Sequence, residues 1–95
     1  MEFKIRENSW IAKLAAKNLC CNAVAIVIGR TVHLHNVSGD QFLRQEKWVK
    51  HEVCHVRQFQ QHGRFVFVLR YLWETLKHGY YNNKYEIEAR AAEEG

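Results

Sequence analysis

The chain has 95 residues, which leave room for one small hydrophobic core and exclude a multidomain enzyme. Hydrophobic residues make up 47% and charged residues 25%, a balance typical of a globular domain and not of a disordered chain. The net charge is +4, but the basic residues are scattered singly along the sequence, so a nucleic-acid-binding function is disfavoured.

The apolar runs and the cysteines predict whether the protein enters a membrane and in which compartment it is found. The longest apolar runs, Ala23–Ile28 and Phe65–Leu69, are much shorter than the ~20 residues of a membrane-spanning helix, so we expect no membrane partner. Three cysteines, of which Cys20 and Cys21 are adjacent, form no disulfide framework and indicate free thiols in a reducing compartment. The first residues lack the pattern of a signal peptide, which favours a cytoplasmic location.

The first part of the chain predicts a helix and then a β-hairpin. Asn8 or Ser9 can cap a helix over residues 10–19, where apolar side chains recur at helical spacing. Ala23–Ile28 and Thr31–His35 are rich in β-branched residues and are separated by a Gly-Arg pair, which is typical of a hairpin. We expect the second strand to lie at a sheet edge, with its histidines exposed.

The rest of the chain predicts three helices. One extends from about residue 42 to 62, where a glycine ends it. Arg64–His78 has a broad apolar face, which predicts a mostly buried helix. Tyr85–Glu94 is a short Ala-rich helix that Asn82 or Asn83 can cap. Together the elements predict an α+β fold in one domain that spans residues 1–95.

The predicted helix over residues 42–62 carries the H-E-x-x-H pattern, with His51, Glu52 and His55. Residues four positions apart lie one helical turn apart on one face, so the two imidazoles can bind one ion. Glu52 falls on the same side and also within the core-facing arc that includes Trp48 and Val56. Since a buried unpaired carboxylate is costly, Glu52 indicates a cation or a cavity beside it.

A catalytic zinc site usually has three protein ligands and a water, so a third ligand must come from elsewhere in the chain. Residue 61 is Gln61 and not the third histidine of the metzincin arrangement. Glu86 and Glu88 lie where the last helix begins, and helix periodicity alone leaves both open as ligands. The further alternatives downstream are Glu74, His62 and His78, whereas Glu93 and Glu94 are expected to form a solvated tail.

These motifs resemble those of the gluzincin metallopeptidases, and the chain is closest in size to the minigluzincins. The resemblance rests on His51–His55 and on residues 83–90, Asn-Lys-Tyr-Glu-Ile-Glu-Ala-Arg, and covers roughly residues 24–92. It implies a zincin-like fold with one Zn²⁺ per chain, and Glu86 as third ligand because that glutamate precedes the small residue Ala89 by three positions. Many members carry an Asp where this chain has Arg90, so another group must orient the ligand imidazole.

The function implied by the resemblance is hydrolysis of a peptide or protein substrate by a zinc-activated water, with Glu52 as general base. Strand 31–35, as an edge strand at the rim of the cleft, would pair with an extended substrate. Two other functions stay open, an inactive zinc-binding module and a basic nucleic-acid-binding protein, and the oligomeric state is undetermined. The candidate oxyanion stabilisers are His78, Tyr80, Tyr81 and Arg90.

Overall fold

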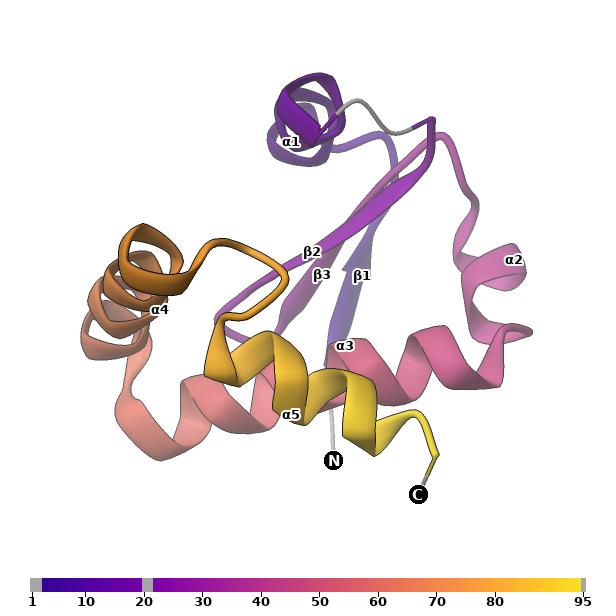
Figure 1. Cartoon of the computed structure of the whole chain (residues 1–95). Helices are drawn as coiled ribbons and strands as arrows, with labels where there is room; N and C mark the ends of the chain where they lie inside the picture. The colour runs from indigo at the N-terminus through magenta and orange to yellow at the C-terminus, as the bar shows by residue number, and fades with distance from the viewer. Residues whose placement is uncertain (1–2, 20–21, 95) are drawn as a thin grey trace.

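The computed structural model describes residues 3–19 and 22–94, so the expectations for Cys20 and Cys21 lie outside the described residues. It has the expected α+β composition, with five helices and one sheet of three strands (Figure 1). Within those ranges no helix has the length and apolar character needed to cross a membrane. In chain order the elements are β1 (Lys4–Arg6), α1 (Trp10–Leu19), β2 (Val24–Ile28), β3 (Thr31–His35), α2 (Gly39–Leu43), α3 (Glu46–His62), α4 (Arg64–His78) and α5 (Lys84–Ala92).

The sheet has the order β1-β3-β2, with β2 antiparallel and β1 parallel to β3. The hairpin is therefore confirmed, but the prediction that Thr31–His35 is an edge strand is wrong. β3 is central because the short strand β1, which has no clear alternation of its own, pairs with its other side. His33 is also buried and not exposed, since its Nδ1 atom lies 2.9 Å from the Ser9 hydroxyl.

The expected long helix over residues 42–62 is two helices, α2 and α3. Ser38 caps α2 through a capping box with Gln41, so helical structure begins earlier than predicted. Residues 44–45 then separate this short helix from α3, which lies below the sheet in Figure 1. Buried side chains from sheet and helices form one core between these layers: Val27, Val32, Leu34, Phe42, Val56, Phe59, Phe67 and Tyr85.

Helix α4 has the predicted bounds but not the predicted burial. Phe67 is its only buried side chain, whereas Phe65 and Leu76 are each 81% exposed. The helix contacts the rest of the molecule along the line of Phe67 and Tyr71, which pack on α3 and α5 through aromatic contacts. Its apolar pattern was therefore correctly assigned to a helix, but most of that face is uncovered in the structure.

Asn83 joins the end of α4 to the start of α5, as expected for the cap of the last helix. Its side-chain oxygen accepts a hydrogen bond from the backbone N–H of Tyr85 at 2.8 Å. Its amide nitrogen donates to the carbonyl of Tyr71 and to the hydroxyl of Thr75, each at 3.0 Å. Because Asn83 is fully buried, these bonds fix where α5 begins and hence where Glu86, three residues later, is directed.

We therefore expect Asn83→Ala to lower the free energy of unfolding by about 2 kcal/mol, since it removes a cap and leaves buried groups of α4 without their donor. Urea denaturation followed by circular dichroism measures the change. Asn82→Ala is the matched control, because this neighbouring side chain is exposed and its loss should cost less than about 0.5 kcal/mol. Equal stability of the two variants would contradict the capping role.

Candidate metal centre

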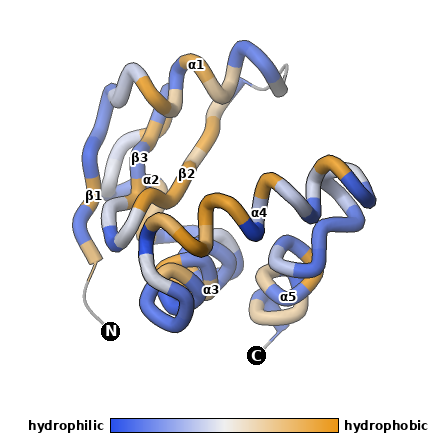
Figure 2. The backbone as a smooth tube through the Cα atoms, turned by 90° about the vertical axis from the view of Figure 1, so that its left-hand side faces the viewer, coloured by the Kyte–Doolittle hydropathy of each residue, from blue (hydrophilic) through white to orange (hydrophobic). Residues whose placement is uncertain are grey.

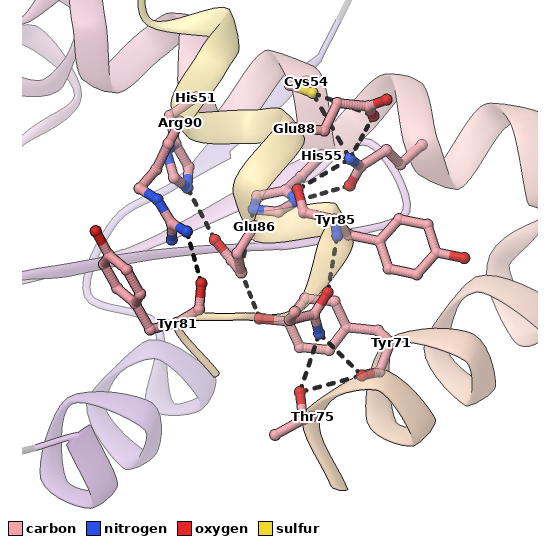
Figure 3. Close-up of polar contacts among 12 residues, drawn as sticks. His51, Cys54, His55, Tyr71, Thr75, Tyr81, Tyr85, Glu86, Glu88 and Arg90 are labelled. Atoms are coloured by element: carbon pink, nitrogen blue, oxygen red, sulfur yellow. Dashed lines mark hydrogen bonds and ion pairs between the residues drawn. The ribbon is translucent and has the colours of Figure 1, made fainter. Parts of the chain in front are cut away.

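Three side chains named by the sequence motifs meet at one point between α3 and α5 (Figure 3). His51 and His55 lie one turn apart on α3, with their ring centroids 5.1 Å apart. Glu86 reaches them from the first turn of α5: its two carboxylate oxygens lie 3.1 Å from His51 Nε2 and 3.2 Å from His55 Nε2. One ligand atom from each residue falls within 4.8 Å of the other two.

Each imidazole is oriented by a partner at its other nitrogen. His51 Nδ1 donates to the Glu93 carboxylate at 2.7 Å, and His55 Nδ1 donates to the Gln58 amide oxygen at 2.8 Å. Gln58 is held in turn, because its amide nitrogen donates to Glu88 at 2.7 Å. These bonds leave both Nε2 atoms directed at Glu86. Glu93 and Gln58 thus orient the imidazoles, a task that Arg90 does not perform in this chain.

The charges of the cluster are strongly coupled. Burial lowers the pKa of His51, but its hydrogen bonds with Glu86 and Glu93 outweigh this effect and raise the pKa to about 9. Burial acts on His55 in the same way, and Glu86 again outweighs it, so the pKa of His55 is also raised. Burial alone would raise the pKa of Glu86, yet the two histidines and Tyr71 hold it well below its usual range.

Glu52 is buried next to this cluster but is not part of it. It lines a cavity of about 330 Å³ together with His51, His55 and Glu86. Burial raises the pKa of Glu52 to about 7, although the nearby His55 and His51 act to lower it. Two carboxyl groups in one cavity thus differ in environment: Glu86 is held ionised, whereas Glu52 can gain and lose a proton near neutral pH.

The cavity is bounded by β2, α3, α4 and one residue of α1, and its walls are mostly apolar. The strand beside it is β2 and not β3, so the predicted rim strand is the other strand of the hairpin. Among the four candidate oxyanion stabilisers only Tyr80 lines the cavity. Arg90 instead donates to the carbonyl of Tyr81 at 2.6 Å and stacks on that ring, while His78 is exposed.

The other ligand candidates lie elsewhere. Glu88 accepts hydrogen bonds from Gln58 and from the buried Cys54 thiol, on the far side of His55 from Glu86 (Figure 3). Glu74 accepts a hydrogen bond from the backbone of Lys84. His62 stacks on Phe67, with ring centroids 6.1 Å apart. Within the described residues, the structure brings only His51, His55 and Glu86 together as a group able to hold a metal ion.

Sequence reasoning missed three residues of the site: Gln58, Tyr71 and Glu93. Gln58 follows His55 by three positions and so shares a helix face with the imidazole it supports, whereas Glu93 follows Glu86 by seven positions and so lies on the same side of the last helix as the proposed ligand. Both spacings were available signals. The expectation that Glu93 belongs to a solvated tail is wrong. Tyr71 lines the cavity and its hydroxyl donates to Glu86, a role that required knowledge of how α4 packs on α5.

The residues present fit a zinc ion. Two imidazole nitrogens and one carboxylate oxygen are a donor set that Zn²⁺ takes in catalytic sites, at bond lengths of about 2.0–2.2 Å. His51 Nε2 lies 3.1 Å from one oxygen of Glu86 and His55 Nε2 lies 3.2 Å from the other, and one atom from each of the three residues lies within 4.8 Å of the other two, so the group is close enough together to hold one ion. Comparisons with protein-family models, with curated proteins and with solved structures find no match to this chain.

Replacing Glu86 and Glu88 of α5 one at a time should show which of the two binds the metal ion and which only holds Gln58 in place. Glu86→Gln removes the negative charge between the two histidines, so we expect zinc affinity to fall by more than about 100-fold. That loss exceeds the usual effect of replacing a residue that only hydrogen-bonds to a metal ligand. Glu88→Gln keeps an oxygen that can accept from Gln58, so affinity should stay within about tenfold. Competition with a zinc chelator measures both values. The reverse order would make Glu88 the ligand.

Zinc binding should also release protons, because a metal needs neutral imidazoles and the pKa values of His51 and His55 are raised. At pH 7 we expect between about one and two protons released per zinc ion, and affinity that weakens as the pH falls. As the pH rises through about 9, the pKa of His51, its contribution to this release should vanish. Calorimetric titration in buffers of different ionisation enthalpy gives the number. A binding enthalpy at pH 7 that is independent of the buffer would contradict this linkage.

Proposed function

We propose that this protein is a zinc-dependent metallopeptidase of the gluzincin type, with a zincin-like fold, that hydrolyses a peptide or protein substrate. The observation that supports the proposal most is the convergence of His51, His55 and Glu86 beside a buried Glu52 whose pKa is raised to about 7. A purely structural zinc site would not require that fourth, titratable group in the same cavity.

The three converging residues would hold one Zn²⁺ per chain. Bound there, the ion would polarise a substrate carbonyl and lower the pKa of a coordinated water to about 7. The hydrogen bonds that the two imidazoles donate to Glu93 and Gln58 keep them directed at this position, so the protein provides the geometry before substrate arrives.

Glu52 is the general base of the proposed reaction. Glu52 is buried in the same cavity as the three proposed ligands, where it would accept a proton from the attacking water and pass that proton to the leaving amine. The walls around it are mostly apolar, and such surroundings strengthen the interaction between the carboxylate and the reacting groups.

Tyr71 would stabilise the developing oxyanion by turning its hydroxyl from Glu86 toward the substrate, with Tyr80 as the alternative on the cavity wall. Both line the cavity, but the Tyr71 hydroxyl already reaches Glu86, at the centre of the cluster. Burial, together with the charge and the hydrogen bond of Glu86, raises the pKa of Tyr71 far above neutrality. The phenol therefore stays protonated and remains a hydrogen-bond donor throughout the range in which Glu52 titrates.

The substrate would lie along β2, the edge strand beside the cavity, and extend the sheet by strand addition. Residues Val24–Ile28 offer backbone groups on that edge, and Phe59, Val68 and Leu72 form apolar walls near Glu52. We therefore expect a preference for an apolar side chain next to the cleaved bond.

The decisive variant is Glu52→Gln, which removes the base but none of the three proposed ligands. We expect zinc binding to be retained and peptide hydrolysis to fall by about 10²–10⁴-fold, the usual contribution of a general acid–base group. Mass spectrometry of a peptide library rich in apolar residues measures cleavage, and elemental analysis measures zinc content.

Glu46→Gln is the matched control, because Glu46 begins the same helix with an 84% exposed side chain and pairs with Lys50 at the surface. Its activity should equal that of the wild type. Equal cleavage by Glu52→Gln would refute the mechanism. Zinc binding without cleavage by any form would favour a zinc-binding module instead.

A further inference from the structure

The outer face of α4 is apolar and uncovered. Phe65 and Leu76 are each 81% exposed, Trp73 is 61% exposed, and Leu69 and Leu72 are more than half exposed. In Figure 2, α4 lies on the side of the molecule turned to the viewer, and orange stretches alternate with blue ones along its tube. Exposed apolar side chains that gather on one face of a helix are typical of a docking surface, so this face is a candidate for one.

Helix α1 carries a second exposed apolar patch. In Figure 2, α1 lies above and α4 below, with β2 between them. Ala12 and Ala16 turn the small face of α1 inward, which leaves Trp10 69% and Leu14 53% exposed. We call these two residues, together with the five exposed side chains of α4, the apolar face. Both helices contribute to the cavity wall, since Ala15 lines it from α1 and Leu72 from α4.

The charges that border the apolar face have one sign. Lys13 and Lys17 are exposed on α1, which contains no acidic residue, and Arg70 and Lys77 are exposed on α4. Glu74 is the single acidic residue of α4, and it is half-buried and accepts a hydrogen bond from a backbone N–H. The acidic residues of the C-terminal part lie mainly on and after α5: Glu86, Glu88, Glu93 and Glu94.

We propose that the apolar face docks on the surface of an anionic lipid bilayer. Exposed Leu, Phe and Trp side chains on amphipathic helices enter the boundary between headgroups and acyl chains, while neighbouring Lys and Arg contact the anionic headgroups. The pairing of Lys77 with Trp73, 5.7 Å from the ring, is the arrangement of an interfacial aromatic and its basic neighbour. This revises the expectation of no membrane partner, which rested on spanning helices alone.

A nucleic acid is the less suitable anionic partner, because its backbone offers no apolar phase for Phe65, Leu69 and Leu76. The docked orientation also has a consequence for the cavity. Leu72 belongs both to the apolar face and to the cavity wall, so the cavity would open at the bilayer surface. Docking itself involves none of the zinc-site residues and is independent of the proposed activity.

Sedimentation with lipid vesicles tests the proposal on the full chain. We expect binding to phosphatidylcholine vesicles that contain phosphatidylglycerol, much weaker binding to phosphatidylcholine alone, and loss of binding at high salt. Glu52→Gln should bind as the wild type does, so that a failure of catalysis and a failure of docking remain distinct. No sedimentation with the anionic vesicles at low salt would overturn the proposal.

Leu69→Ser/Leu76→Ser should weaken vesicle binding by more than about tenfold while the far-UV circular dichroism stays unchanged, since both side chains are already exposed. Leu43→Ser is the matched control, because Leu43 is 51% exposed on α2, across the molecule from α4 (Figure 1). Arg70→Gln/Lys77→Gln should weaken binding several-fold, and Lys47→Gln, on α3, should not. Equal binding by the leucine variant and the wild type would contradict the proposal.

Fluorescence quenching by brominated lipids locates the contact. Trp73 alone, in Trp10→Phe/Trp48→Phe, should be quenched by anionic vesicles, whereas Trp48 alone, in Trp10→Phe/Trp73→Phe, should not, because Trp48 packs on Phe42. Two further outcomes would overturn the proposal. One is a lipid-free dimer that the leucine variant dissociates, which would assign the apolar face to a second copy of the chain. The other is RNA that displaces the protein from vesicles by binding at this face.

Discussion

The buried carboxylate of Glu86 is the interaction on which the arrangement of the C-terminal half depends. It contacts His51 and His55 of α3 and Tyr71 of α4, so one side chain joins three helices. A carboxylate at 3% exposure would be strongly destabilising without partners of opposite charge. The two histidines are therefore as necessary to the burial of Glu86 as Glu86 is to a metal site, and stability and proposed chemistry share the same contacts.

A second layer of hydrogen bonds makes this arrangement specific. Gln58, Glu88 and Glu93 fix the imidazoles from behind, while Asn83 fixes the start of α5 against the end of α4. Within the described residues every buried side-chain nitrogen or oxygen has a partner, so the polar interior is fully satisfied. Such a network resists small displacements of the histidines, which is the condition for a preorganised catalytic centre.

The two faces of helix α4 have different environments. Phe67 and Tyr71 face inward and support the core and the proposed centre, whereas most of its other apolar side chains face outward. In a chain of 95 residues the core is too small to cover both faces of such a helix. An uncovered apolar face beside the cavity lowers solubility, and a docking function would explain why the chain keeps it. Docking would place the proposed peptidase at the surface of a bilayer, where it would meet its substrates.

Local sequence signals determined most of the elements and the core of the site, but not β1 or the break between α2 and α3. Capping residues and glycines placed α1, α4 and α5 to within a few residues, and the i, i+4 spacing of His51 and His55 required only that their segment be helical. The tertiary structure alone decided that β1 makes β3 central, that α4 is exposed, and that Glu86 and not Glu88 faces the histidines. Periodicity shows which residues share a face of a helix or strand, but what covers that face depends on contacts between residues far apart in the chain, and those are set by packing.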